Sequence, residues 1–343
     1  MSLSLNIYCQ LLPLKSVFRI ARGAKTTAEV IVVTLSDGKN IGWAEAVPYA
    51  RYKESITSVK NQIQDICQPS SMTDIATLEQ AIAKMPSGAA KNVLDCSLWD
   101  LKAKQQQQSV AELMLLPESK QCISAQTLSI DTPEAMAKAV KSLKNPPLVK
   151  VKLDQHDIIK KMTAIAAAAP QSKFIVDANE GWTFDNLTQC AEQLKQLNVV
   201  LIEQPLAVGQ DQQLNNYTSP IPLCADESCH TVKDLENLKD KYQVVNIKLD
   251  KTGGLTQAFA LAKEAQAQGF SIMLGCMVGS SLAMAPATLL TSMASFVDLD
   301  GPFLIAEDKE NGFIFHQGVM SPLSYNLWGG AQNYQANTLS QLK

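Results

Sequence analysis

Three acidic side chains close three successive apolar segments in the middle of the chain. Asp177 ends the segment KFIVD, Glu203 ends VVLIE and Asp226 follows PLCA. If these segments are neighbouring parallel strands, their carboxylates meet at one rim and repel one another unless a cation lies between them. Carboxylate oxygens are preferred ligands of Mg²⁺, which keeps coordination positions open for water and substrate oxygens. We therefore expect a Mg²⁺ site, with a helix N-cap or a solvated loop position as the alternative for each acid taken alone.

Lysines flank this group of acids along the sequence. Lys150 and Lys152 are separated by Val151, and the two-residue period of a strand places both ammonium groups on one face. Lys248 follows another apolar segment, VVNI. A lysine beside a second ammonium and a divalent cation is expected to have a lowered pKa, which suits it to act as a base. Lys152 and Lys248 are thus the candidate acid/base pair, and exposed positions at the mouth of the fold are the alternative.

A second acidic pair, Asp298 and Asp300, follows the last apolar segment of this kind. Their two-residue spacing places both carboxylates on the same side of an extended chain. A site with three carboxylate ligands does not need these two further charges, which suit a substrate ammonium group. The alternatives are an N-cap and a salt bridge to Lys251.

The elements that must position these residues alternate regularly. Apolar, β-branched segments recur at roughly 22 to 27 residues, the length of a strand plus a crossover helix. There are eight of them: CISAQTLS, LVKVKLD, KFIVDA, VVLIE, PLCAD, VVNIKLD, SIMLGC and SFVDLD. A doubly wound open sheet shows the same alternation, but no GxGxxG motif follows an early strand here. The pattern predicts an α/β barrel with its site at the carboxyl ends of the strands, where Lys152 and Lys248 face each other from the second and sixth strands.

The first third of the chain does not follow this alternation. Strand patterns at residues 6–14 and 29–38 precede helical patterns at 76–85 and 92–104. A chain of 343 residues is also longer than one ordinary core organises. We predict an α+β capping domain over residues 1–115, completed by the segment at about 315–343, and a barrel domain over residues 116–314.

Composition excludes several classes of function. The net charge of −3 gives no basic field for a nucleic acid. No apolar run approaches the roughly 18 residues of a membrane span, and the N-terminus lacks a signal-peptide pattern. We expect a cytoplasmic protein with no membrane partner. Eight cysteines without a CxxC pair, and only three histidines, disfavour a zinc site.

Taken together, these residues resemble the enolase superfamily, and within it the muconate-lactonizing subgroup. The resemblance covers nearly the whole chain, including two stretches that are similar to loops of a capping domain, Phe18 to Gly23 and Tyr49 to Glu54. The closing Asp298-Leu299-Asp300 resembles the dipeptide epimerases. The motifs that carry the resemblance are Lys150-Val151-Lys152, Val176-Asp177-Ala178-Asn179-Glu180-Gly181-Trp182, Glu203-Gln204-Pro205, Asp226-Glu227-Ser228 and Lys248-Leu249-Asp250-Lys251-Thr252-Gly253-Gly254.

The resemblance implies a modified (β/α)8 barrel of the (β/α)7β type and one Mg²⁺ per subunit. It implies a small dipeptide substrate, L-Ala-D/L-Glu, whose C-terminal α-carbon is inverted by two-base proton transfer through a Mg-stabilised enediolate. By position it assigns the metal to Asp177, Glu203 and Asp226, the proton transfers to Lys152 and Lys248, and the substrate ammonium to Asp298 and Asp300. It also implies that Lys150 is a partner of Lys152 and contacts the charged part of the substrate. Thr127 and Cys276 would be further substrate contacts. Either Arg22 or Lys25 would bind the substrate's side-chain carboxylate.

Two alternative functions are compatible with part of this pattern. A lyase or cycloisomerase similar to o-succinylbenzoate synthase shares the metal and the lysines but has no need of an ammonium-binding pair. A non-catalytic, metabolite-binding barrel is disfavoured because all the acids and lysines are present. The setting that the resemblance implies is the recycling of murein peptides. The oligomeric state stays open, with a homo-oligomer among the alternatives.

Overall fold

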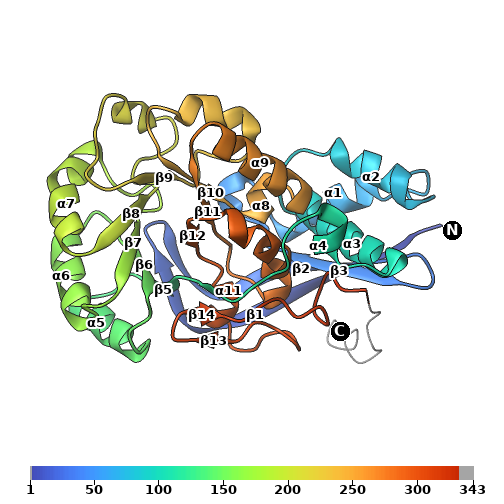
Figure 1. The fold of residues 1–343 in the computed structure, drawn as a ribbon, viewed down its shortest axis with the longest axis horizontal. Helices are drawn as coiled ribbons and strands as arrows, with labels where there is room; N and C mark the ends of the chain where they lie inside the picture. The colour runs from blue at the N-terminus through green and yellow to red at the C-terminus, as the bar shows by residue number, and fades with distance from the viewer. Residues whose placement is uncertain (1, 332–343) are drawn as a thin grey trace.

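A closed parallel sheet forms the larger part of the computed structural model, which describes residues 2–331 (Figure 1). Within these residues the sheet has eight strands that follow one another in chain order. The backbone N–H of Ala125 donates to the carbonyl of Val297 at 2.8 Å, which brings the last strand beside the first. The strands are β5 (Gln126–Leu128), β6 (Leu148–Lys152), β7 (Lys173–Asp177), β8 (Val199–Glu203), β9 (Leu223–Ala225), β10 (Val244–Ile247), β11 (Ser271–Leu274) and β12 (Phe296–Val297). The predicted barrel is confirmed.

Two of the longer helices of the barrel begin with a side-chain cap. Helix α5 (Pro133–Ser142) starts after Thr132, whose hydroxyl accepts a hydrogen bond from the backbone of Ala135. Helix α7 (Phe184–Gln196) starts with a capping box. Such caps satisfy N–H groups that have no partner within the helix. Helix α6 (Ile158–Ala168) buries Ile158, Met162 and Ile165, and α9 (Leu255–Ala267) covers the sheet beside β10 and β11.

Other connections differ from the regular alternation. Two are short 3₁₀ segments, η2 (Asp211–Leu214) after β8 and η3 (Val232–Leu238) after β9. Pro205, Gly209 and Pro220 interrupt the first of these connections, and proline and glycine do not favour a long helix. The first predicted strand is also divided, because β4 (Cys122–Ile123) pairs outside the barrel. Four further short segments complete the barrel: α8 (Leu249–Thr252), α10 (Ser281–Met284), η4 (Ala285–Met293) and α11 (Gly301–Leu304).

An antiparallel sheet with helices on one side lies beside the barrel, at the right of Figure 1. Its strands are β1 (Ser4–Ile20), β2 (Gly23–Ser36) and β3 (Ile41–Ala46). The hairpin of β1 and β2 extends past this sheet until its tip reaches the barrel strands. The associated helices are η1 (Ala50–Tyr52), α1 (Ile56–Ile66), α2 (Ile75–Ala83), α3 (Ala89–Gln106) and α4 (Val110–Met114). These elements supply the loops that cover the barrel mouth.

The chain after the barrel returns to this first sheet. Strands β13 (Phe315–His316) and β14 (Val319–Met320) pair with each other, and β14 pairs with β4. The indole of Trp43 donates to the carbonyl of Leu327 at 2.7 Å. Residues 332–343 of the segment predicted to complete the cap lie outside the described residues. The division at residues 115 and 314 stays a prediction.

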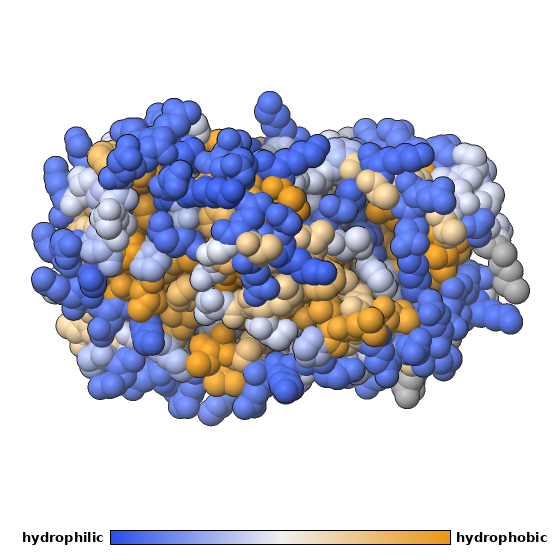
Figure 2. Space-filling view, turned by 45° about the horizontal axis from the view of Figure 1, so that its top comes forward, coloured by the Kyte–Doolittle hydropathy of each residue, from blue (hydrophilic) through white to orange (hydrophobic). Residues whose placement is uncertain are grey.

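The surface is mixed in polarity. Figure 2 shows one face on which hydrophilic side chains predominate around smaller hydrophobic areas. None of the helices in residues 2–331 is both long and apolar enough to cross a membrane.

Candidate active site

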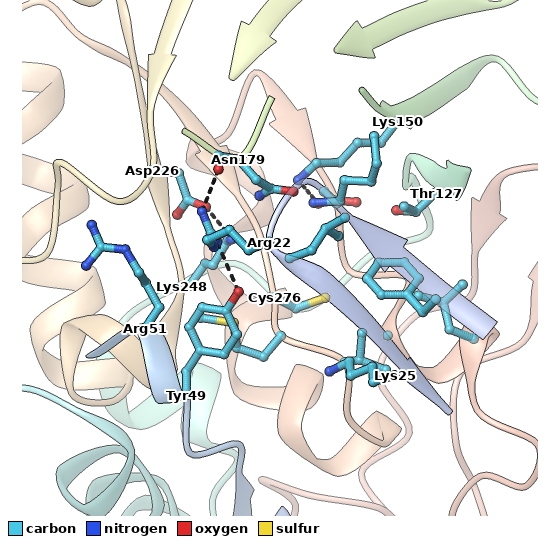
Figure 3. A pocket seen from close by; sticks show the side chains of 18 of the residues that line it. Arg22, Lys25, Tyr49, Arg51, Thr127, Lys150, Asn179, Asp226, Lys248 and Cys276 are labelled. Atoms are coloured by element: carbon cyan, nitrogen blue, oxygen red, sulfur yellow. Dashed lines mark hydrogen bonds and ion pairs between the residues drawn. The ribbon is translucent and has the colours of Figure 1, made fainter. Parts of the chain in front are cut away.

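A cavity of about 500 Å³ opens at the carboxyl ends of the barrel strands, beneath the tip of the β1–β2 hairpin (Figure 3). It contains most of the predicted site residues, which come from segments far apart in the chain. Asp177 and Glu203 do not line it, because they are fully buried in the layer below. The predicted residues that line the cavity are Arg22, Lys25, Thr127, Lys150, Lys152, Asp226, Lys248, Cys276, Asp298 and Asp300.

The buried floor of this cavity is a network of carboxylates and lysines. The Nζ atom of Lys150 lies 3.1 Å from Oδ2 of Asp177, 2.7 Å from Oε2 of Glu203 and 2.7 Å from Oδ2 of Asp298. One ammonium group therefore joins three acids that come from β7, β8 and the end of β12.

The two candidate acid/base lysines each pair with one of the predicted metal ligands. Nζ of Lys152 lies 2.5 Å from Oδ2 of Asp177, and Nζ of Lys248 lies 2.6 Å from Oδ2 of Asp226. Lys152 ends β6, whereas Lys248 directly follows β10, four strands away in a closed sheet of eight. The two amines thus enter the cavity from opposite sides of the barrel.

The pKa of Lys248 is raised in this network, whereas a lowered lysine pKa was expected from the sequence. Burial lowers the pKa of Lys248, but attraction by Asp226 outweighs it and holds this pKa well above its ordinary value. The pKa of Lys150 is raised in the same way by Asp298, Glu203 and Asp177. The expectation considered a nearby ammonium and a cation but not direct pairing of each lysine with a carboxylate. In the structure as it stands, the direct pairs dominate.

The three predicted metal ligands lie close together without forming a ready-made cage. Within residues 2–331, no three acidic, histidine or cysteine side chains are arranged as a metal site, because the lysines lie between the carboxylates. The donor set still fits a hard divalent cation. Asp177 and Glu203 already approach a single positive charge, and Oε2 of Glu203 is a buried oxygen that accepts no hydrogen bond.

The second acidic pair lies at the edge of the same network. Asp298 turns one oxygen to Lys150, while its other oxygen is buried and accepts no hydrogen bond. Asp300 accepts a hydrogen bond from the backbone N–H of Thr127 at 2.6 Å. Burial and repulsion by Asp298 raise the pKa of Asp300 to about 7. This pair therefore has capacity to accept hydrogen bonds from a positively charged group in the cavity.

The two basic residues of the hairpin tip have different surroundings. Arg22 donates to the carbonyl of Asn179 at 2.6 Å, to Tyr49 at 3.0 Å and to Oε1 of Glu227 at 2.7 Å. Lys25, within the described part of the chain, has no hydrogen bond or ion pair to its ammonium group, and burial lowers its pKa. Figure 3 shows Arg22 close to Tyr49, with Lys25 on the other side of Cys276 in this view. Arg22 therefore holds the hairpin to the barrel, whereas Lys25 faces the cavity.

Comparison with known proteins identifies the family of this chain. The family model for the mandelate racemase / muconate lactonizing enzyme N-terminal domain matches residues 2–114, and the enolase C-terminal domain-like model matches residues 134–321. The chain belongs to the mandelate racemase / muconate lactonizing enzyme family.

Several members of this family are similar over nearly their whole length. N-acetyl-D-glutamate racemase of a Pseudoalteromonas species is 59% identical over 314 residues, which are 92% of this chain and 99% of that one. L-Ala-D/L-Glu epimerase of Escherichia coli K12 is 45% identical over 319 residues, again 92% and 99%. A family member from Agrobacterium tumefaciens with homology to dipeptide epimerases, solved with sodium and L-Ala-L-Glu, superposes with a TM-score of 0.90 at 40% identity, covering 95% of this chain and 100% of that one. These relatives support an isomerase that acts on amino acid derivatives.

A more distant family member was solved with magnesium. The dipeptide epimerase of Methylococcus capsulatus, in complex with Mg and L-Arg-D-Lys, superposes with a TM-score of 0.85 at 25% identity, covering 94% and 97%. A bound metal is therefore found in structural neighbours of this chain.

Some contacts of the family site were not predicted from the sequence. Lys251, considered as a partner of the second acidic pair, instead lies 2.7 Å from Oδ1 of Asp226. Asn246 donates to Oε1 of Glu203 at 2.8 Å. The only sequence signal for Asn246 is its position two residues before Lys248, which places it on the same face of β10.

Proposed function

We propose that this chain is a dipeptide epimerase that inverts the α-carbon of the C-terminal residue of L-Ala-D/L-Glu. The observation that carries the proposal is a single cavity with an amine on either side, Lys152 from β6 and Lys248 after β10. A base on each side of a flat carbanion can remove a proton from one face and return a proton to the other. Such a dipeptide would come from the murein peptides of a bacterial cell wall, and the proposed setting is their recycling.

The buried carboxylates and Lys150 at the bottom of the cavity would make the α-proton of the substrate easier to remove. Asp177, Glu203 and Asp226 would hold Mg²⁺, which would supply positive charge beside the substrate's terminal carboxylate. The substrate carboxylate then lies beside Lys150, whose ammonium adds a hydrogen bond to the negative charge that develops as the proton leaves. Lys152 and Lys248 exchange roles according to which epimer is bound.

The free ammonium group of Lys25 provides a test of side-chain specificity. We expect Lys25→Met to raise KM for L-Ala-L-Glu by about 10- to 100-fold, the loss of one charge-assisted hydrogen bond. L-Ala-L-Met has a side chain of similar length without a carboxylate, so its KM should not rise. Steady-state kinetics with both dipeptides check this. An equal loss for both would mean that Lys25 acts on the fold of the hairpin and not on the substrate side chain.

N-acetylglutamate is a second candidate substrate. It is an acylated glutamate like L-Ala-Glu but lacks the ammonium group of the alanyl residue. Asp298 is already paired with Lys150 at 2.7 Å, so part of the acidic pair is satisfied without a substrate ammonium. The 59% identical relative is named for activity on N-acetyl-D-glutamate. The two candidates are therefore distinguished at Asp298 and Asp300.

The preference between these substrates should depend on pH through Asp300. Because the raised pKa of Asp300 is about 7, its charged form, which attracts an ammonium, is lost as the pH falls through that value. The ratio of kcat/KM for L-Ala-L-Glu to that for N-acetyl-L-glutamate should therefore fall below pH 7. Asp300→Asn should lower the ratio by about 10- to 100-fold and remove its fall below pH 7.

The ratio is informative because titrations common to both reactions, such as those of the lysines, cancel. A wild-type protein that epimerises N-acetyl-L-glutamate well, with no activity on L-Ala-L-Glu at any pH, would replace the first candidate by the second. A pH-independent ratio that Asp300→Asn leaves unchanged would remove the acidic pair from substrate recognition.

A further inference from the structure

Glu203 is as fully buried as Asp177 among the predicted metal ligands, and its two oxygens have different partners. Oε2 lies 2.7 Å from the ammonium of Lys150, on the side of the acid network. Oε1 accepts a hydrogen bond from Nδ2 of Asn246 at 2.8 Å and lies 4.0 Å from Nζ of Lys248. Both Glu203 and Asn246 are completely buried. One carboxylate oxygen is thus held by a neutral amide, while the other faces a positive charge.

The orientation of the Asn246 amide is determined by this contact. Its Oδ1 atom is buried and accepts no hydrogen bond within the described residues. The hydrogen bond of the amide to Glu203 is donated by its NH₂ group. A flipped amide would point its oxygen at an acidic oxygen and leave its NH₂ group without that acceptor. A buried polar group in that position is costly. Asn246 is therefore fixed as a donor to Glu203.

Gly275 supplies the space that the Asn246 side chain occupies. A Cβ atom built on Gly275 would lie 2.5 Å from Oδ1 and 2.7 Å from Nδ2 of Asn246. Asn246 has no solvent-exposed surface into which it could shift. Glycine at position 275, at the end of β11, is therefore explained by the amide beside it and not by its backbone conformation.

We propose that Asn246, accommodated by Gly275, is a positioning residue that holds Oε1 of Glu203 and turns Oε2, which here faces the ammonium of Lys150, toward a divalent cation. The inference rests on the metal-binding part of the proposed function. It predicts a site with a monodentate glutamate, which suits the small, octahedral Mg²⁺ better than the larger Ca²⁺, since Ca²⁺ accepts bidentate carboxylates. Groups that orient a metal ligand in this way contribute about 10- to 100-fold to metal affinity.

The test uses the full chain and Mn²⁺, whose binding is followed by electron paramagnetic resonance without substrate. Asn246→Leu keeps the shape of the side chain but removes the donor, and it should raise the Kd for Mn²⁺ by about 10- to 100-fold. Gly275→Ala keeps the donor but takes its space, and a similar loss is expected. Competition with Mg²⁺ and Ca²⁺ should show that the preference for Mg²⁺ falls in both variants.

A double-mutant cycle distinguishes this role from a general loss of packing. Asn246→Ala empties the space beside residue 275, so adding Gly275→Ala to it should cause no further loss of Mn²⁺ affinity. Losses that simply add, or Mn²⁺ affinity and Mg²⁺ preference unchanged in Asn246→Leu, would overturn the inference. Circular dichroism identifies a variant that does not fold, in which case the other single variant gives the answer. If the wild-type chain itself binds no Mn²⁺, the proposed metal site fails, which is a different outcome.

Discussion

Replacing Lys248 by alanine is expected to abolish epimerisation of L-Ala-L-Glu, with a loss in kcat of about 10³- to 10⁴-fold. Lys152→Ala should have an effect of the same size. Each variant lacks the base for one face of the α-carbon, and a proton removed by the remaining lysine returns to the face that it left. Inversion therefore stops even though one proton transfer is still possible. Proton NMR of the dipeptide, which resolves the two epimers, measures the loss.

Binding of the dipeptide should survive in both lysine variants. The groups proposed to hold the dipeptide are Lys150 and the metal site at its terminal carboxylate, Lys25 at its side chain, and Asp298 and Asp300 at its ammonium. Neither substitution removes any of these groups. Isothermal titration calorimetry in the presence of Mg²⁺ measures this directly. Lys161→Ala is a matched control, because Lys161 forms a 2.8 Å ion pair with Asp154 on the barrel but does not line the cavity. Full activity in either Lys152→Ala or Lys248→Ala would refute the two-base scheme.

Removal of divalent metal is expected to have the second large effect. Chelation should lower kcat by about 10³-fold or more, because the stabilisation of a developing charge by a metal amounts to several kcal/mol. Addition of Mg²⁺ should restore activity, and Glu203→Gln should prevent this restoration. Glutamine has nearly the same shape as Glu203 but lacks the charge that holds a cation in this buried network.

The control for the metal prediction is the protein after chelation, shown by elemental analysis to be free of metal. If that sample epimerises the dipeptide at the original rate, the carboxylates serve only to hold the lysines. Since Glu203 contacts Lys150 at 2.7 Å, a variant could also disturb the lysines, so the metal-free wild-type sample is the decisive one.

The barrel could be predicted from the sequence because each of its strands is a local pattern. An apolar run that ends in Asp177 or Glu203 places its acid at the strand end whatever the distant chain does, and the structure agrees. The two-residue spacing of Lys150 and Lys152 likewise predicted that both side chains lie on one face of the strand. In the structure both line the cavity. Strand length and alternation were therefore sufficient for these positions.

The partners of these residues could not be predicted, because they depend on contacts between distant segments. Arg22 meets Glu227 across 205 positions of sequence, and nothing local distinguishes it from Lys25. The sequence also could not show that Asp226 lies 2.6 Å from Lys248, and this pairing reversed the expected direction of the lysine pKa shift. Charge balance in a buried site depends on distances that only the folded chain supplies.

The most direct test of the two-base proposal is exchange of the α-hydrogen in deuterated buffer with Mg²⁺, followed by mass spectrometry and NMR. The wild-type protein should incorporate deuterium at the α-carbon of the C-terminal residue, starting from L-Ala-L-Glu or from L-Ala-D-Glu. Lys152→Ala should retain exchange with only one epimer, and Lys248→Ala with only the other. Exchange of both epimers by the same single-lysine variant, or no α-exchange by the wild-type protein, would contradict two amines acting on opposite faces of one carbon.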